Sequence, residues 1–136
     1  MTERRVTVRG IIFNDGKLFA QKLKRQDGER DYWCTPGGGL DPNESLHDGL
    51  VREMIEETGI APKIGKLLLV QQYADSHKEF LEFFFHIENP EDYHTIDLEN
   101  TTHGMIEVAR CEFVDPRQTT VLPEILQTMD IAELID

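Results

Sequence analysis

The chain has few of the features that mark secreted, membrane-bound or polyanion-binding proteins. Cysteine is scarce: Cys34 and Cys111 are the two thiols among 136 residues, which excludes a disulfide framework and predicts reduced thiols. No apolar run approaches the roughly 18 residues of a membrane span. The basic residues 1–5 lead into a strand pattern rather than the apolar segment of a signal peptide. We therefore expect a cytoplasmic protein without a membrane partner.

Positive charge is also scarce. The chain has 14 Lys and Arg residues against 26 Asp and Glu residues, which gives a net charge of −12. So acidic a surface repels polyanions, which excludes a general binder of nucleic-acid polymers. A small phosphorylated substrate is still compatible if metal ions screen the carboxylates. The length and the hydrophobic share of 39% predict one globular domain over residues 1–136.

The residue pattern predicts a mixed α/β fold. The turn signal Asn14-Asp15-Gly16 separates two β-branched or apolar runs and predicts a hairpin. The predicted strands are residues 6–13, 17–23, 32–35, 64–73, 80–87 and 105–114, with loops at 24–31 and 88–101. The predicted helices are residues 45–58, with Asn43 or Ser45 as N-cap and Gly59 as C-cap, and residues 122–135. This order favours a mixed sheet with helices packed on it.

The helix at residues 45–58 carries three carboxylates on one face. At helical spacing, Glu53, Glu56 and Glu57 share an arc about 100° wide. A core-facing stripe on another side of the helix is formed by Leu50, Val51, Met54 and Ile55. Crowded carboxylates are unfavourable unless a cation lies among them. Mg²⁺ takes carboxylate and phosphate oxygens, so the face is a candidate metal site.

Neighbouring residues fit the same interpretation. Gly49 lies beside the carboxylates, and its lack of a side chain is predicted to leave space on the helix surface for a phosphate chain. Arg52 precedes Glu56 by one helical turn and is expected to hold its rotamer. The glycines at 37–39 bring bare backbone close to the helix, where N–H groups suit phosphate and a carbonyl suits a metal. Each feature alone has a plainer interpretation, a solvated acidic face or a simple turn.

Taken together, residues 38–60 resemble the Nudix box, G-x5-E-x7-R-E-U-x-E-E-x-G-U, where U is a bulky aliphatic residue. Its fixed positions are occupied by Gly38, Glu44, Arg52, Glu53, Met54, Glu56, Glu57, Gly59 and Ile60. A chance match in this chain has a probability on the order of 10⁻⁸. The one departure is Asn43, where the family often has glycine, and Asn tolerates a left-handed backbone.

The resemblance implies an α/β/α sandwich with a mixed β-sheet. It also implies a pyrophosphohydrolase that uses Mg²⁺ or Mn²⁺ and in which water attacks a phosphorus of a diphosphate. By position in the box, Glu53, Glu56 and Glu57 are the expected metal ligands, with a backbone carbonyl of Gly37 or Gly38. Glu53 or Glu56 is the expected general base, and Arg52 the residue that orients a glutamate. Glu44 is expected to hold the loop to the helix, with a distal metal contact as the alternative.

Other candidate residues lie outside the box or at its edge. Glu107 is the first candidate for an acid contributed by a later loop, and Glu99 and Asp97 are the next candidates. The expected substrate-binding residues are Gly38, Gly39, Lys22, Lys24 and Trp33, and Tyr32 and Tyr73 are candidates to stack a base. The five histidines lack the spacing of zinc ligands, and none is expected to be catalytic.

The sequence leaves the substrate open within nucleotide-like diphosphates. A (deoxy)nucleoside triphosphate is favoured because signatures of other family branches are absent. The alternatives are an ADP-ribose or nucleotide-sugar pyrophosphatase, or a nucleotide-binding sensor without turnover. The resemblance also suggests a homodimer, for which the sequence shows no interface.

Overall fold

The fold is built on two β-sheets. A computed structural model describes residues 3–136, so Met1 and Thr2 of the expected domain lie outside the described residues. The first sheet has the strand order β6-β1-β8-β7, with bounds β1 Glu3–Ile11, β6 Gly37–Gly39, β7 Ile64–Ala74 and β8 Lys78–Ile87. In it β1 pairs parallel with β8, whereas β1 with β6 and β7 with β8 pair antiparallel. The predicted mixed pairing is confirmed.

The second sheet is centred on β3 (Lys17–Arg25). Its other strands are β2 (Phe13–Asn14), β4 (Gly28–Glu29), β5 (Trp33–Cys34), β9 (Val108–Val114) and β10 (Val121–Leu122). The hairpin between β2 and β3 confirms the turn signal, because Asp15 and Gly16 both have positive φ, 53° and 78°. The predicted loop at residues 24–31 instead contains the end of β3 and the short β4, which pair with each other.

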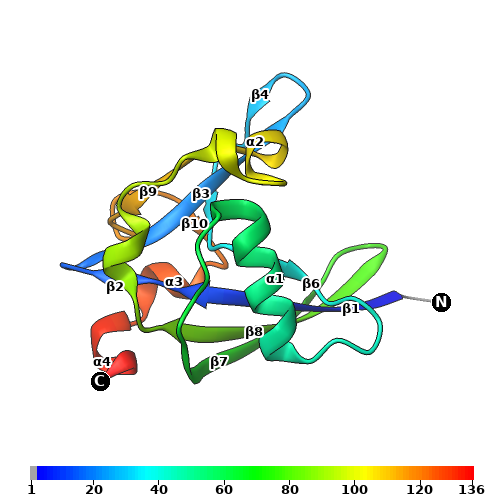
Figure 1. Cartoon of the computed structure of the whole chain (residues 1–136). Coiled ribbons are helices and arrows are strands. Elements are labelled where there is room, and N and C mark those ends of the chain that lie inside the picture. The colour runs from blue at the N-terminus through cyan, green and yellow to red at the C-terminus, as the bar shows by residue number, and fades with distance from the viewer. Residues whose placement is uncertain (1–2) are drawn as a thin grey trace.

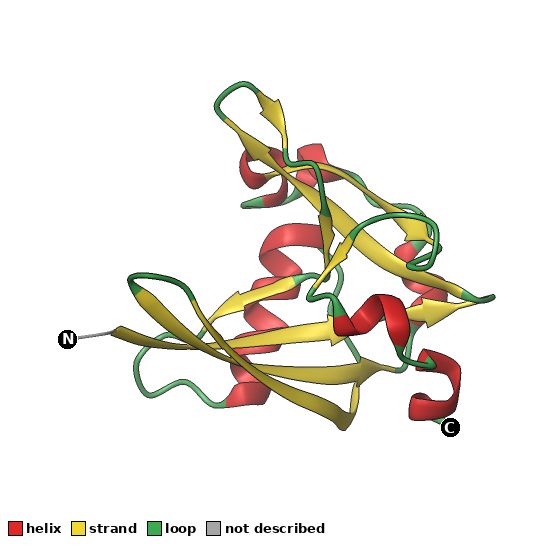
Figure 2. Ribbon diagram, turned by 180° about the vertical axis from the view of Figure 1, so that it is seen from behind, coloured by secondary structure: helices red, strands yellow, loops and turns green. Residues whose placement is uncertain are grey.

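Helices cover the sheets from two sides. Helix α1 (Leu46–Thr58) lies on one side, and α3 (Ile125–Thr128) and α4 (Ile131–Ile135) lie on the opposite side (Figures 1 and 2). The short helices η1 (Pro90–Tyr93), η2 (Leu98–Asn100) and α2 (Gly104–Glu107) lie in the connection between β8 and β9. None of the described helices is long and apolar enough to cross a membrane.

Helix α1 has the predicted caps. The Ser45 hydroxyl accepts a hydrogen bond from the Asp48 N–H at 3.0 Å, and Gly59 ends the helix with φ 78°. Leu50 and Met54 are fully buried, as the predicted stripe requires. Ile55 is 41% exposed, so the stripe was wrong at this position. The sheets contact a narrower arc of the helix than its apolar residues span.

Two further predicted elements were wrong in extent. The expected strand at residues 105–114 begins at Val108, because Gly104–Glu107 turn as helix α2. The expected closing helix at residues 122–135 is split into β10, α3 and α4. The split occurs where Met129 is extended and the Asp130 side chain caps a new helix by accepting from Glu133 N–H at 3.1 Å. The expected loop at residues 88–101 contains η1 and η2.

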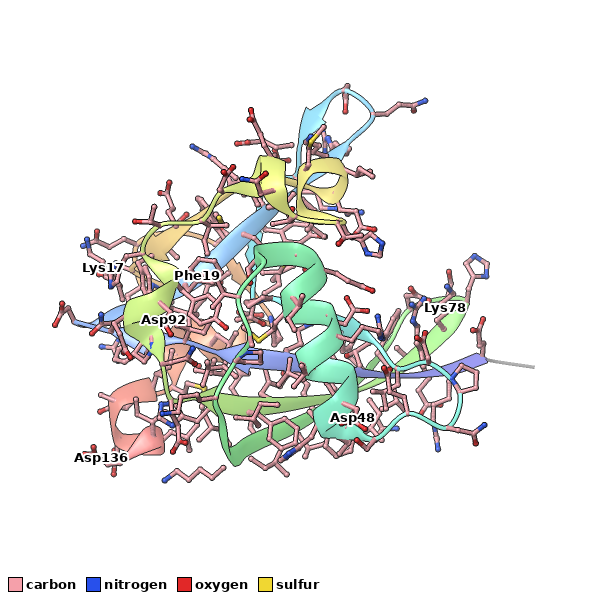
Figure 3. All side chains as sticks on the ribbon, in the orientation of Figure 1. Lys17, Phe19, Asp48, Lys78, Asp92 and Asp136 are labelled. Atoms are coloured by element: carbon pink, nitrogen blue, oxygen red, sulfur yellow. The ribbon has the colours of Figure 1, made fainter. Side chains whose placement is uncertain are left out.

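Strand β8 is covered on both faces, so the hydrophobic core has two parts. Phe85 and Ile87 pack with Leu50 and Met54 in the part beneath α1. The neighbouring Phe84 packs in the other part, beneath α3 and α4. Figure 3 shows side chains filling the space between the sheets and α1. The polar residues that face inward from these strands are therefore enclosed, which matters for the site.

Candidate active site

Glu53 lies against the glycine strand β6. A Cβ atom at Gly38 would lie 2.6 Å from the Glu53 carboxyl carbon, so the glycine makes room for this carboxylate. Arg52 donates a hydrogen bond to Glu53 Oε1 at 3.0 Å. Burial raises the pKa of Glu53, and the charges of Glu56 and Glu107 add to the rise against the opposing effect of Arg52. Glu53 is thus an enclosed carboxylate among other acids.

Glu57 is the most deeply enclosed of the three glutamates, with 4% of its surface exposed. The Gly37 N–H donates to its Oε2 at 3.1 Å, and the Gln21 side-chain amide donates to its Oε1. Among residues 3–136 no basic side chain forms an ion pair with it. Burial raises the pKa of Glu57 to about 8. A buried carboxylate without a paired cation is suited to a hard divalent ion.

Gln21 was missed by the sequence reasoning. It is a buried polar residue on β3, 1% exposed, on the side of the strand that faces α1. Its signal in the sequence is weak: a single amide in an otherwise apolar stretch of the strand. Its amide fixes the orientation of the Glu57 carboxylate.

Arg52 joins the loop before α1 to the carboxylate face. Its guanidinium donates to both oxygens of Glu44, at 2.8 and 2.9 Å, and to the Gly39 carbonyl at 3.0 Å. It also donates to Glu56 Oε2 at 3.2 Å, as the one-turn spacing predicted. Hydrogen bonds from Arg52 and the Asp41 N–H lower the pKa of Glu44 to about 2. Glu44 therefore makes the expected contact between loop and helix.

The prediction that Gly49 leaves open space on the helix surface was wrong. Gly49 is buried, and a Cβ atom there would lie 2.3 Å from Leu40 Cδ2 and 3.1 Å from Glu44 Oε1. The loop before α1 packs directly on this glycine. Its small size therefore serves the packing of the loop and leaves no space for a phosphate chain.

His103 is a second residue that sequence reasoning missed. Its Nδ1 lies 3.0 Å from Glu56 Oε2, and its backbone N–H donates to the Glu56 carbonyl at 2.8 Å. The two residues are far apart along the chain, and no motif links them. Glu56 Oε2 is thus held from two sides, by Arg52 and by His103.

We expect His103→Ala to lower kcat about 10-fold with little change in KM, because Glu56 loses one of its two partners. Steady-state kinetics on the metal-loaded protein measures this. His77→Ala is the control, since His77 is exposed in the turn between β7 and β8. A kcat equal to that of the unchanged protein would show that the contact does not position Glu56.

The remaining candidate residues lie in separate places. Glu107 ends helix α2, and its charge reaches Glu53. Lys22 and Trp33 lie together instead, with the Lys22 ammonium 5.3 Å from the Trp33 ring centre and 3.5 Å from Glu29. Lys24 donates to the Met105 carbonyl. The charge of Glu107 thus acts on Glu53, whereas the contacts of Lys22, Lys24 and Trp33 are with residues other than the three glutamates.

The carboxylates share a face without converging on one point. In the described part of the chain, no group of three or more His, Cys, Asp and Glu side chains is arranged to hold a metal ion. Arg52 occupies the space between Glu44, Glu53 and Glu56. The donor set of carboxylates and nearby glycine backbone nevertheless suits Mg²⁺ or Mn²⁺.

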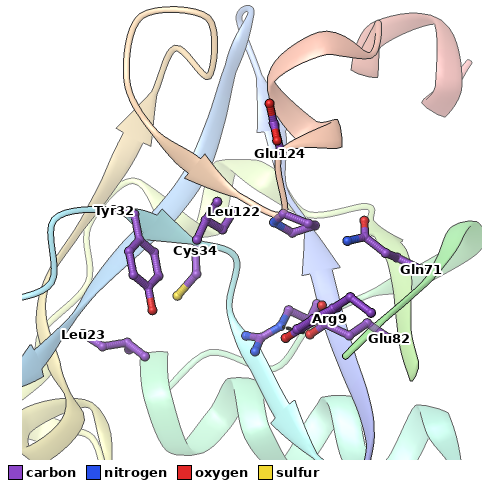
Figure 4. A pocket seen from close by; sticks show the side chains of 10 residues that line it. Arg9, Leu23, Tyr32, Cys34, Gln71, Glu82, Leu122 and Glu124 are labelled. Atoms are coloured by element: carbon purple, nitrogen blue, oxygen red, sulfur yellow. Dashed lines mark hydrogen bonds and ion pairs between the residues drawn. The ribbon is translucent and has the colours of Figure 1, made fainter. Parts of the chain in front are cut away.

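A cavity of about 380 Å³ lies between strands of the two sheets (Figure 4). It is lined by Arg9, Leu23, Tyr32, Cys34, Gln71, Tyr73, Glu82, Leu122, Pro123 and Glu124. The backbone of Arg9 in β1 pairs with that of Gly37 in β6, whose N–H contacts Glu57. Gly37 therefore links the strand that carries Arg9 to the acidic helix face, although no residue of α1 lines the cavity.

Comparison with known proteins agrees with this geometry. A model of the NUDIX domain matches residues 3–130. The chain belongs to the NUDIX family. The solution structure of the E. coli ORF135 protein is similar, with a TM-score of 0.70 and 25% identity over 92% of this chain and 85% of that one. The Nudix fold expected from the sequence is thus confirmed.

Two relatives of this Nudix chain are a CTP pyrophosphohydrolase and an ADP-ribose pyrophosphatase. CTP pyrophosphohydrolase of Escherichia coli (strain K12) is 35% identical over 71 residues, 52% of this chain and 48% of that protein. ADP-ribose pyrophosphatase of Methanocaldococcus jannaschii is 37% identical over 70 residues, 52% of this chain and 41% of that protein. The matches span about half the length of these relatives or less.

Proposed function

We propose that this Nudix protein is a metal-dependent pyrophosphohydrolase of (deoxy)nucleoside triphosphates. The observation that carries the proposal is the link through Gly37 between Glu57 of α1 and the strand whose Arg9 lines the cavity. The cavity has the size of a small-molecule pocket and is largely bounded by apolar and aromatic side chains. A nucleoside in the cavity would place its phosphates at Glu53, Glu56 and Glu57.

The charges at the cavity favour a base over a further phosphate group. Arg9 contributes one positive charge, whereas Glu82 and Glu124 contribute two negative charges. Arg9 is already paired with Glu82 at 2.9 Å. A second anionic group in the cavity would therefore meet uncompensated negative charge. A neutral base avoids this cost.

Residues on this face have distinct roles in the proposed reaction. Glu53, Glu56 and Glu57 would hold Mg²⁺ or Mn²⁺, which when bound supplies positive charge to offset that of the pyrophosphate. Glu53 or Glu56 takes the proton from the attacking water at a carboxylate oxygen. Arg52 and His103 hold Glu56 in place, and Gln21 holds Glu57. Glu107 adds a fourth carboxylate to the same region.

The test is turnover across a panel of nucleoside triphosphates, ADP-ribose, other nucleotide sugars and dinucleoside polyphosphates. Each is assayed with Mg²⁺, with Mn²⁺ and with chelator. We expect metal-dependent release of pyrophosphate or phosphate from nucleoside triphosphates, and no release with chelator. Turnover of ADP-ribose or a nucleotide sugar alone would replace the proposed substrate class. Tight binding of a nucleotide without turnover would indicate a sensor.

A further inference from the structure

A buried ion pair forms one wall of the cavity. Glu82 of β8 is 2% exposed, and its Oε2 accepts from the Thr7 hydroxyl at 2.8 Å and from Arg9 Nε at 2.9 Å. Arg9 Nη1 donates to the Thr35 carbonyl at 2.9 Å. Because β1 and β8 pair in register, Thr7 opposite Glu82, the backbone fixes this arrangement. Figure 4 shows Arg9 and Glu82 together, across the cavity from Tyr32 and Cys34.

Two atoms of this pair are left for a ligand. Within residues 3–136, neither Oε1 of Glu82 nor Nη2 of Arg9 has a hydrogen-bond partner, although both residues line the cavity. Neither atom is sealed from solvent, since the Thr35 hydroxyl is the one fully enclosed and unpaired side-chain atom in the described chain. The free groups are thus one acceptor oxygen, the two N–H groups of Arg9 Nη2 and the second N–H of Arg9 Nη1.

We propose that Arg9 and Glu82 select cytosine as the base, an inference that rests on the proposed function. The 4-amino group of cytosine donates to Glu82 Oε1, while N3 and O2 accept from the guanidinium of Arg9. This donor-acceptor-acceptor edge of cytosine matches the unpaired acceptor of Glu82 and the unpaired donors of Arg9. The apolar side chains of Leu23 and Leu122 line the same cavity and suit the faces of a ring.

The other bases match the unpaired groups of Arg9 and Glu82 less well. Uracil has a carbonyl where cytosine has its amino group, so an acceptor would face Glu82 Oε1. Guanine presents two adjacent donors beside one acceptor and needs two acceptor oxygens, but Glu82 Oε2 is already used by Thr7 and Arg9. Adenine offers one acceptor beside its amino group and leaves part of the guanidinium unpaired. Each mismatch leaves a buried polar group without a partner, which opposes binding.

The position of the pair also suits a base attached to phosphates. Burial by itself lowers the pKa of Arg9, but the charges of Cys34, Glu82 and Glu57 outweigh that effect and raise it. Gly37 links Arg9 and Glu57 along a chain of contacts. Its backbone pairs with that of Arg9, and its N–H donates to the Glu57 carboxylate.

The experiment compares kcat/KM for CTP, UTP, GTP, ATP and the CTP analogue that lacks the 4-amino group, 2-pyrimidinone riboside triphosphate. We expect CTP to exceed each of the others about 10- to 100-fold. Glu82→Gln presents an amide N–H to the base, so it should lower kcat/KM for CTP about 10-fold and raise the UTP-to-CTP ratio. Glu79→Gln is the matched control, since Glu79 pairs with Arg4 on the same two strands and lies outside the cavity.

A second measurement does not depend on the variant folding. Calorimetric titration of the unchanged protein with CMP and UMP should show at least about 10-fold tighter binding of CMP. Equal kcat/KM for the four triphosphates, or equal affinity for CMP and UMP, would overturn the selection of cytosine and leave the proposed function intact. If the protein hydrolyses other diphosphates but no nucleoside triphosphate, the proposed function is overturned. The affinities for CMP and UMP would still show whether the cavity prefers cytosine.

Discussion

Glu57→Gln is expected to lower metal-dependent kcat by about 10²- to 10³-fold while making the metal-free protein more stable at pH 8. The loss of activity follows because the amide loses the charge that would hold the metal ion. The gain in stability follows because Glu57 is 4% exposed and forms no ion pair with a basic residue of the described chain. Activity and stability therefore change in opposite directions at one residue.

The pH dependence of this gain has a definite sign. Burial raises the pKa of Glu57 from 4.5 to about 8 in the folded protein. Between these values the folded state binds more protons than the unfolded state, so the free energy of unfolding falls as pH rises. The contribution of Glu57 is fully present below pH 4.5 and is lost as pH rises through about 8. At pH 8 the free energy of unfolding of the variant should exceed that of the unchanged protein by about 4 kcal/mol.

Urea unfolding of both proteins with chelator, at pH 5 and pH 8, measures this difference. Adding Mg²⁺ should stabilise the unchanged protein much more than the variant. Glu91→Gln is the control, because Glu91 is an exposed acid in η1 and should change neither kcat nor stability. Unchanged turnover by Glu57→Gln would contradict the assignment of Glu57 to the metal site.

Gly37→Ala is expected to destabilise the protein by about 3–5 kcal/mol, a loss large enough to prevent folding in a marginally stable domain. Gly37 has a φ of 139°, which L side chains rarely adopt. A Cβ atom there would also lie 2.0 Å from the Val8 carbonyl oxygen. The obstacle is backbone of the paired strand β1, so it cannot move aside without breaking the sheet.

Gly28→Ala separates the two causes. Gly28 has a similar φ of 133°, but nothing lies within 4 Å of a Cβ atom there. It should lose about 1–2 kcal/mol from backbone strain alone. Thermal or urea unfolding of the two variants measures the difference. Equal losses would show that strain, rather than the contact with β1, explains why residue 37 is glycine.

The acidic helix could be predicted from the sequence in detail. The spacing of Glu53, Glu56 and Glu57 places them on one face because an α-helix repeats every 3.6 residues. Ser45 and Gly59 mark its ends because their side chain and backbone satisfy the terminal groups. These features depend on neighbours along the chain. The hairpin at Asp15 and Gly16 was predictable for the same reason.

The supporting residues of the site could not be predicted in this way. Gln21, His103 and the pair of Arg9 with Glu82 contact their partners across strands or loops that are distant in sequence. Gly49 was misread because helical position alone does not show that Leu40 folds back on it. The predicted closing helix was too long, because Asp130 caps a new helix and aspartate is unfavourable inside one.

The amino-acid sequence alone was enough to establish the family, the acidic face of α1 and the acidic net charge. These follow from composition and from contiguous residues, whose geometry the helix period fixes. The side chains that surround those carboxylates, and the position of the cavity, became known from the tertiary structure. Strand register sets Arg9 against Glu82 and Gly37, and packing encloses Glu57. Register and burial arise from contacts between distant segments, which no local pattern specifies.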